Sequence, residues 1–274
     1  MDDTKQSAVR YLSRPDGRVA YDVSGVGQLV VLVPGMGDLR STYRYLAPAL
    51  LSAGYRVATT DLRGHGDSDA SFTAYGDAAT GADLLALVVE LGGPAVVIGN
   101  SLGAGAAVWA AAERPDLVQG LVLVGPFVRD GAVGPLRRLV LRLAMVPLWA
   151  AVSWKAYQPK LYGGRRPADF TEHRDATVAS IRRPGYSRAF SRTSRISHAE
   201  AAARLGEVRA PSVVVMGELD PDFDSPSQEA GWIASRLGSQ IVMVADAGHY
   251  PQSQSPQVTA AAVLAFLAAV GTGA

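Results

Sequence analysis

The sequence predicts an α/β protein in which a doubly wound, mostly parallel sheet carries an inserted helical cap. Two observations predict the sheet: short apolar runs rich in β-branched residues recur along the chain, and stretches with apolar residues at helical spacing separate them. A third observation predicts the cap. The alternation stops between residues 126 and 200, and this segment also differs from the rest of the chain in charge and aromatic content.

An antiparallel hairpin is expected first, because the runs AVRYL and RVAYDV flank the turn sequence RPDGR. Most of the later runs are continuously apolar, which is typical of parallel strands covered on both faces. These strands are expected at residues 29–35, 55–61, 95–100, 121–125, 212–217 and 241–246. Helices are expected between them at residues 41–53, 76–91, 102–113, 226–237 and 256–268.

Residues 126–200 are basic and rich in aromatic side chains. They contain 14 Lys or Arg against 5 Asp or Glu, although the whole chain has 26 basic and 25 acidic residues. They also hold 8 of the 20 Phe, Trp and Tyr residues. Because such segregation suggests a separate structural unit, residues 1–125 and 201–274 are expected to form the core, and residues 126–200 a helical cap, or lid.

Composition narrows the class of protein. With 274 residues, 48% of them apolar and 19% charged, the chain is long enough for one globular domain with an insertion. It has no cysteine, which excludes thiol nucleophiles, disulfides and thiolate metal sites. The basic segment carries no motif of a nucleic-acid reader, so nucleic acid is not an expected partner.

The N-terminal residues and the longest apolar stretches bear on location. The run MDDTKQSAVRYLSRPDG is polar and begins with acidic side chains, unlike a secretory signal, so a cytoplasmic protein is expected. The charge-free stretches Leu143–Trp154 and 258–270 are shorter than a bilayer span. Membrane partners are therefore not expected, and the oligomeric state is not indicated.

Ser101 lies in the sequence GNSLG, residues 99–103, which matches G-x-S-x-G between an expected strand and an expected helix. A sharp strand-to-helix turn strains the backbone at the serine, and the flanking positions must lack side chains so that neighbouring backbone can pass. At a helix N-terminus, backbone N–H groups favour negative charge developing near the hydroxyl. The motif predicts a nucleophile, with an ordinary N-cap serine as the alternative.

A serine hydroxyl needs a base to accept its proton, and the chain has four histidines. His249, in DAGHYPQ, follows the last expected strand, where a loop can reach the carboxyl edge of the sheet. His65 lies in the turn-rich stretch DLRGHGDSD and is expected to organise that loop. His173 and His198 fall in the cap and are expected to be solvated. His249 is therefore the candidate base.

An acid that orients this base is expected on the same edge of the sheet. Asp220, in MGELDPDF directly after SVVVMG, is the preferred candidate. Asp222 and Asp224 are close rivals, Glu218 is a weaker one, and Asp130, after the strand LVLVG, is a separate candidate. Any of them could instead be a turn residue.

The chain order Ser, Asp, His and five short stretches resemble the α/β-hydrolase superfamily, in the capped branch that includes esterases and carbon–carbon bond hydrolases. The stretches are VLVPGMGD, TTDLRGHGDSD, IGNSLG, MGELDPDF and AGHYPQSQSP, and the resemblance covers nearly the whole chain. It implies an α/β-hydrolase fold. It also implies an oxyanion hole made by the backbone N–H groups of Met36 and Leu102.

Three positions bear on how far the resemblance extends. Pro34 and Asn100 stand where many members of the family have His, which removes the basis for assigning a substrate by close analogy. Relatives that open epoxides or displace halide carry aspartate at the elbow. Ser101 at that position argues against both reactions.

These residues predict acyl transfer without a metal or an organic cofactor. His249 would deprotonate Ser101, the alkoxide would attack a carbonyl, and water would release the acid. The expected substrate is a small carboxylic ester, including methyl esters of bulky or aromatic metabolites. The aromatic side chains expected to line its pocket are Phe127, Trp149, Trp154, Tyr157 and Tyr162.

Two other functions are compatible with the same residues. One is a different reaction on this scaffold, such as carbon–carbon bond hydrolysis or cofactor-independent oxygenation. The other is a receptor that binds a ligand without turnover, although the complete Ser, Asp and His set favours an enzyme. The basic residues of the cap could equally form a solvated face, with its aromatic residues as the core of the lid.

Overall fold

The structure, a computed structural model, describes residues 9–131 and 135–271. Its centre is an eight-stranded sheet with the order β1-β2-β4-β3-β5-β6-β7-β8. The hairpin strands β1 and β2 are antiparallel, and every later pairing from β4–β3 to β7–β8 is parallel. The strands are β1 (Arg10–Arg14), β2 (Gly17–Ser24), β3 (Leu29–Val33), β4 (Arg56–Thr60), β5 (Ala95–Asn100), β6 (Val118–Val124), β7 (Ser212–Gly217) and β8 (Gln240–Val244).

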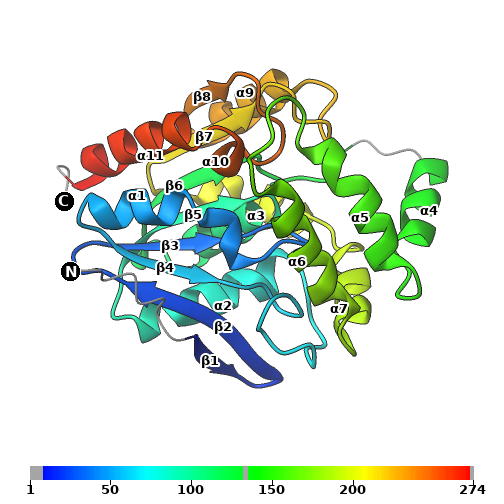
Figure 1. Cartoon of the computed structure of the whole chain (residues 1–274). Helices are drawn as coiled ribbons and strands as arrows, with labels where there is room; N and C mark the ends of the chain where they lie inside the picture. The colour runs from blue at the N-terminus through cyan, green and yellow to red at the C-terminus, as the bar shows by residue number, and fades with distance from the viewer. Residues whose placement is uncertain (1–8, 132–134, 272–274) are drawn as a thin grey trace.

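Helices cover both faces of the sheet, as Figure 1 shows. The even and odd residues of β3 explain why: Val31 and Val33 face one hydrophobic cluster, and Val30 and Leu32 face another. The first cluster holds α2 (Asp77–Glu90), α3 (Leu102–Glu113), α8 (Ala199–Arg204) and α9 (Pro226–Leu237) against the sheet. The second holds α1 (Leu46–Ser52) and α11 (Pro256–Gly271), with the short α10 (Pro251–Gln254) leading into α11. The doubly wound α/β fold is therefore confirmed.

One expected helix is divided. Residues 41–53 form a 3₁₀ turn, η1 (Arg40–Tyr43), followed by the separate helix α1. Pro48 accounts for the break, because it has no N–H to donate to the carbonyl of residue 44 and is tolerated only in the first turn of a helix. The helices expected at 102–113 and 226–237 have the bounds that the pattern predicts.

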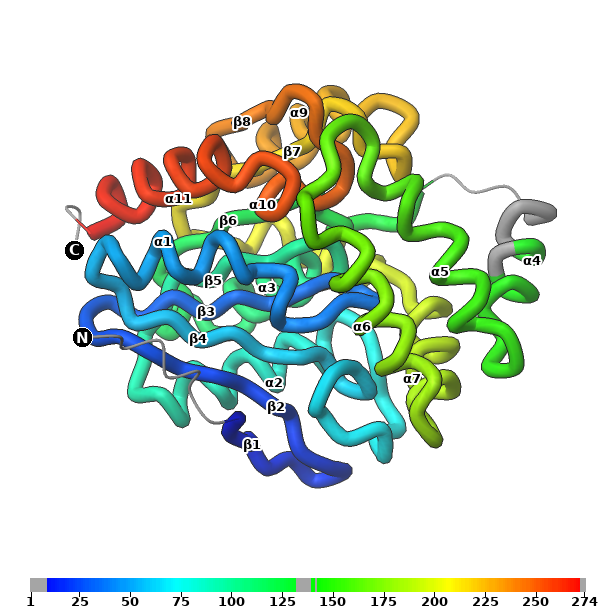
Figure 2. The backbone as a smooth tube through the Cα atoms, in the orientation of Figure 1, coloured from blue at the N-terminus to red at the C-terminus, as the bar shows by residue number. Residues whose placement is uncertain are grey.

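The chain between β6 and β7 forms a helical layer beyond the carboxyl ends of the strands (Figures 1 and 2). Its helices are α4 (Pro135–Ala144), α5 (Ala150–Leu161), α6 (Phe170–Arg182) and α7 (Tyr186–Thr193). A third hydrophobic cluster, which includes Trp154, Tyr162 and Phe190, packs within this layer, and we refer to the layer as the cap below. The chain returns to the core through α8 and η2 (Leu205–Glu207), which pack on α3.

No helix in the described part of the chain is both long enough and apolar enough to span a membrane.

Candidate active site

Ser101 occupies a sharp turn between β5 and α3. Its φ of 56° and ψ of −122° are unusual for a residue with a side chain. The turn depends on its two glycines. A Cβ at Gly99 would lie 2.3 Å from the Gly103 carbonyl oxygen, and a Cβ at Gly103 would lie 2.4 Å from that of Val33. The G-x-S-x-G spacing is thus a steric requirement of this backbone, which presents the serine at the carboxyl edge of the sheet.

His249 and Asp220 form a buried pair on that edge. The His249 Nδ1 and the Asp220 Oδ2 are 2.7 Å apart, and each residue is about 2% exposed. Asp220 follows β7, and His249 lies in the loop after β8. Burial lowers the pKa of His249. The hydrogen-bonded Asp220 carboxylate, with Asp222 and Asp38, raises it by more, so the net pKa lies above its ordinary value.

The neighbours of Ser101 connect it to His249. The Asn100 Nδ2 donates to the His249 carbonyl oxygen (3.2 Å), and the Phe127 N–H donates to the Ser101 carbonyl oxygen (3.3 Å). The Phe127 ring in turn lies 5.7 Å from the His249 ring, centroid to centroid. Through these neighbours, the turn at Ser101 lies next to the loop that carries His249, although the two residues are far apart in sequence.

The other candidate acids have different surroundings. Asp222 lies 3.9 Å from the His249 Nδ1, donates its N–H to the Asp220 Oδ1 (3.1 Å) and accepts a hydrogen bond from the Tyr157 hydroxyl. Asp130 accepts from the His198 N–H (2.8 Å), while Glu218 and Asp224 are exposed. Asp220 is the buried carboxylate in direct hydrogen-bond contact with the imidazole.

Asp220, Asp222 and His249 are also the set of side chains within the described residues that could hold a metal ion, since their donor atoms lie within 4.8 Å of one another. However, the short hydrogen bond to Asp220 occupies the Nδ1 of His249. A metal at this position would have to break that bond.

The loop after β3, residues 34–39, lies against Ser101. A Cβ at Gly35 would come within 2.7 Å of the Ser101 Cβ, so the two backbones are in close approach. Met36 belongs to this loop, and Leu102 begins α3 directly after Ser101. Both backbone N–H groups expected to form an oxyanion hole therefore belong to segments adjacent to the serine.

Four of the five expected pocket aromatics contact this region. Phe127 packs against His249, Tyr162 stacks on Tyr250 at 4.8 Å, and the Trp154 Nε1 donates to the Gly37 carbonyl oxygen (2.9 Å). Tyr157 bonds to Asp222. Trp149 differs: it is 44% exposed and donates to the Leu143 carbonyl oxygen within the cap.

The expectation that His173 and His198 are solvated is wrong. The His173 Nε2 lies 2.7 Å from the Asp38 Oδ1, and both residues are buried. The His198 Nδ1 lies 3.0 Å from both carboxylate oxygens of Asp77. Each histidine belongs to the cap side of the chain and each aspartate to the core, and these partners are more than 120 residues apart, so no local sequence signal could reveal them.

His65 does organise its loop. Its Nδ1 lies 2.8 Å from the Arg63 carbonyl oxygen, and the side chain is buried. Burial lowers the pKa of His65, so this histidine is neutral near pH 7.

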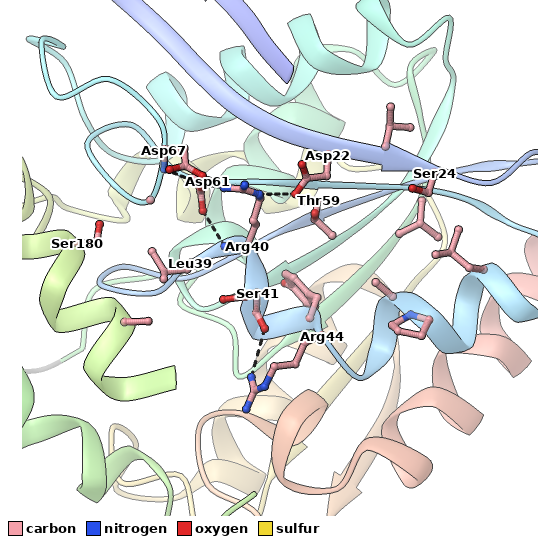
Figure 3. Close-up of a pocket in the computed structure, with 18 of the residues that line it drawn as sticks. Asp22, Ser24, Leu39, Arg40, Ser41, Arg44, Thr59, Asp61, Asp67 and Ser180 are labelled. Carbon is pink, nitrogen blue, oxygen red and sulfur yellow. Dashed lines mark hydrogen bonds and ion pairs between the residues drawn. The ribbon is translucent and has the colours of Figure 1, made fainter. Parts of the chain in front are cut away.

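A cavity of about 1150 Å³ lies elsewhere, between α6, η1, α1 and the strands β2 and β4. Figure 3 shows that Arg40 extends across it. The guanidinium pairs with Asp22 (2.5 Å), Asp61 and Asp67 (2.8 Å). Ser101, Asp220 and His249 do not line this cavity, and the network around Arg40 links the segment after the loop 34–39 to the core.

A sequence model of the alpha/beta hydrolase family matches residues 30–262. The chain is 26% identical over 268 residues to a 2-(acetamidomethylene)succinate hydrolase from Mesorhizobium japonicum, with 92% of each protein covered.

Solved structures give the same fold. A thermophilic esterase from Thermogutta terrifontis superposes with a TM-score of 0.75 and 25% identity, covering 96% of this chain and 97% of that one. An esterase from Exiguobacterium antarcticum superposes with a TM-score of 0.81 at 18% identity, covering 93% of this chain and 98% of that one. At that lower identity, the likeness concerns the fold alone.

Proposed function

Because the chain belongs to the alpha/beta hydrolase family and is a hydrolase on that fold, we propose that it is a serine hydrolase that cleaves a small carboxylic ester through an acyl-enzyme. The observation that carries this proposal is the buried hydrogen bond between His249 and Asp220 beside the strained turn at Ser101. Nucleophile, base and orienting acid are the three parts that such chemistry requires.

The hydrogen bond to Asp220 determines which ring nitrogen of His249 can accept the proton of the serine. Since the Nδ1 donates its proton to the carboxylate, the Nε2 is the nitrogen left to accept the proton of the Ser101 hydroxyl. The serine oxygen then attacks the ester carbonyl, and the carbonyl oxygen becomes an oxyanion. His249 passes the proton to the departing alcohol, which leaves Ser101 acylated.

Water completes the cycle. His249 takes a proton from a water molecule that attacks the acyl carbonyl, and returns it to Ser101 as the carboxylic acid leaves. In both halves of the reaction the N–H groups of Met36 and Leu102 would stabilise the oxyanion. Loss of one such donor typically lowers the rate by about 10²–10³.

The aromatic residues next to the proposed nucleophile favour a bulky or aromatic group on the ester. The Phe127 ring packs against both the His249 ring and the Phe223 ring, with centroid distances of 5.7 and 5.0 Å. A mostly apolar wall with few polar groups is typical of small-molecule sites.

A second candidate is hydrolysis of the amide bond of an N-acyl compound. The Mesorhizobium japonicum relative is named for 2-(acetamidomethylene)succinate, whose acetamido group carries such a bond. The same nucleophile, base and oxyanion donors would serve, with nitrogen in place of oxygen as the leaving atom.

Replacement of Ser101 by Ala tests the proposal. Turnover of p-nitrophenyl esters should fall at least about 10³-fold, because the variant has no nucleophile, while the thermal unfolding temperature stays close to that of the wild type. The matched control is Ser235→Ala, at an exposed serine on α9, which should retain full activity. Hydrolysis by the Ser101→Ala variant at the wild-type rate would refute the assignment.

A panel of methyl esters, lactones, β-diketones and N-acyl amides then separates the candidate reactions. Preference for methyl esters supports the proposal. Preference for amides or β-diketones would replace it with the corresponding alternative.

A further inference from the structure

Two buried side chains of the cap bond to consecutive residues of the loop 34–39. Trp154 on α5 bonds to Gly37, and His173 on α6 bonds to Asp38. These are the two residues after Met36. We propose that Trp154 and His173 are positioning residues that hold the Met36 N–H in place for the oxyanion, so that the seated cap completes the oxyanion hole. The inference rests on the proposed function, because it requires an oxyanion at this site.

Trp154 fixes the loop by both packing and hydrogen bonding. Its Nε1 donates to the Gly37 carbonyl oxygen (2.9 Å), and the residue is 2% exposed. Gly37 has a φ of +71°, and a Cβ there would lie 2.5 Å from the indole. The loop and the indole are thus in direct contact. The Phe190 ring of α7 also packs on the indole, with a centroid distance of 5.3 Å.

His173 makes the second attachment. Its Nε2 bonds to the Asp38 Oδ1 (2.7 Å), and its Nδ1 lies 3.4 Å from the Ser41 Oγ. The same carboxylate oxygen accepts the Leu39 N–H (2.8 Å). Burial raises the pKa of Asp38, but His173 and the hydrogen bonds to Leu39 and Thr42 together lower it by more, so the carboxylate stays ionised. A buried charged acceptor makes this bond stronger than an ordinary neutral one.

The core holds the same loop at its two ends. At one end, Gly35 lies against Ser101. At the other, the Arg40 N–H donates to the Asp61 Oδ1 (2.8 Å), and the Arg40 side chain bonds to its three carboxylates, as Figure 3 shows. Residues 36–38 lie between these two anchors. There the Asp38 N–H donates to the Gly35 carbonyl oxygen (3.3 Å), and the side-chain bonds from Trp154 and His173 of the cap add to it. Loss of the cap bonds would therefore loosen the part of the loop that carries the Met36 N–H.

Oxyanion donors act in the transition state and contribute little to binding of the substrate. A displaced donor should therefore lower kcat and leave KM nearly unchanged. The effect should be smaller than complete loss of a donor, which costs about 10²–10³. A decrease in kcat of about 10–50-fold is expected.

The experiment compares Trp154→Phe, which keeps an aromatic ring but removes the donor, with Trp232→Phe on α9 of the core as the matched control. The substrate is a p-nitrophenyl ester. In Trp154→Phe we expect kcat to fall about 10–50-fold with KM within about threefold. Trp232→Phe should stay within about twofold of the wild type.

A pair of inhibitors distinguishes positioning from general damage. A trifluoromethyl ketone becomes a hemiketal oxyanion on Ser101, whereas the matching methyl ketone binds mainly unreacted. In Trp154→Phe the Ki of the trifluoromethyl ketone should rise by the same factor as kcat falls, and the Ki of the methyl ketone should not change. Since a Ki does not depend on the fraction of active protein, this comparison holds even for a partly unfolded variant.

His173 supplies an independent check. His173→Leu should behave like Trp154→Phe, and His173→Gln should recover part of the loss, because its amide can again donate to Asp38. Wild-type kcat in both Trp154→Phe and His173→Leu, or parallel weakening of both ketones, would overturn the inference.

Ser101→Ala distinguishes failure of the positioning role from failure of the proposed function. If that variant is inactive while Trp154→Phe is unaffected, the positioning role fails and the proposed function survives. If Ser101→Ala keeps its turnover, both fail.

Discussion

At the scale of single residues, the side chain of each of the four histidines has a hydrogen-bond partner. His249, His173 and His198 each pair with an aspartate, and His65 bonds to a backbone carbonyl oxygen. The sequence distinguished His249 through its place after the last strand. It did not reveal the pairs of His173 and His198, because their partners come from other elements and pairing depends on how the cap sits on the core.

The difference between Asp220 and Asp222 leads to a direct prediction. Asp220→Asn should lower kcat by about 10³–10⁴-fold, because the amide no longer fixes the tautomer of His249 or stabilises its charged form. Asp222→Asn, at a carboxylate 3.9 Å from the Nδ1, should cost less than about tenfold. Steady-state kinetics on the two variants measures both values. Equal losses would contradict the assignment of the acid.

The raised pKa of His249 also sets the pH dependence. The base must be neutral to accept a proton, so kcat/KM of the wild type should fall as the pH drops through an apparent pKa above the ordinary histidine value of about 6.5. In Asp222→Asn, which removes a second negative charge near the ring, this acid limb should move to lower pH. A wild-type profile that stays flat down to pH 6 would exclude His249 as the titrating base.

At the scale of elements, the sheet and its helices follow closely from sequence patterns, and the connections do not. The runs LVVLV and AVVIGN became buried central strands because both of their faces are apolar. The helix expected over 41–53 was divided at Pro48, and α10 before α11 was not expected. Such local breaks depend on single hydrogen bonds, which apolar periodicity does not report.

Gln254 in α10 shows how one side chain can fix two loops. Its Oε1 accepts the N–H groups of Gly248 (2.9 Å) and Tyr250 (3.2 Å), on either side of His249. Its Nε2 donates to the carbonyl oxygens of Gly163 (2.9 Å) and Arg165 (2.6 Å) in the cap. The residue is 1% exposed, and its bonds to the Gly248 and Tyr250 N–H groups are buried, so these two groups depend on it.

Gln254→Ala should therefore lower the free energy of unfolding by about 3 kcal/mol, since the two buried N–H groups of Gly248 and Tyr250 would lose their partner at about 1–3 kcal/mol each. Gln257→Ala, at an exposed position of α11, is the matched control and should change it by less than about 0.5 kcal/mol. Urea denaturation of both variants measures the difference. Similar stabilities would show that water replaces the amide without cost.

At the scale of the whole molecule, the uneven charge of the chain reflects how the cap meets the core. Arg44 of the core bonds to Asp169 at 2.5 and 2.6 Å, Arg129 bonds to Glu229, and Arg183 donates to the Gly66 carbonyl oxygen. Arg129 and Arg183 are thus basic side chains of residues 126–200 that bond across the boundary between cap and core, while Arg174 and Lys155 pair with Asp175 inside the cap. The segregation of charge predicted a separate unit, but its partners became visible only in the folded molecule.

The proposed active site also lies at the boundary between cap and core. The nucleophile, base and acid belong to the core, while the His249 N–H donates to the Leu161 carbonyl oxygen of the cap (2.8 Å), and Trp154 bonds to the loop beside Ser101. The proposed catalytic side chains could be picked out from the sequence because their motifs are local. The supporting contacts from the cap could not, because they join residues that the fold alone brings together.

Reaction with a fluorophosphonate tests the central claim most directly, because this reagent needs a nucleophilic serine assisted by its base and its oxyanion hole. Intact-mass and peptide mass spectrometry should show one adduct, on the peptide that contains Ser101, with strongly slowed labelling in His249→Ala and none in Ser101→Ala. An adduct on another residue, or turnover that persists after Ser101 is fully modified, would contradict the account.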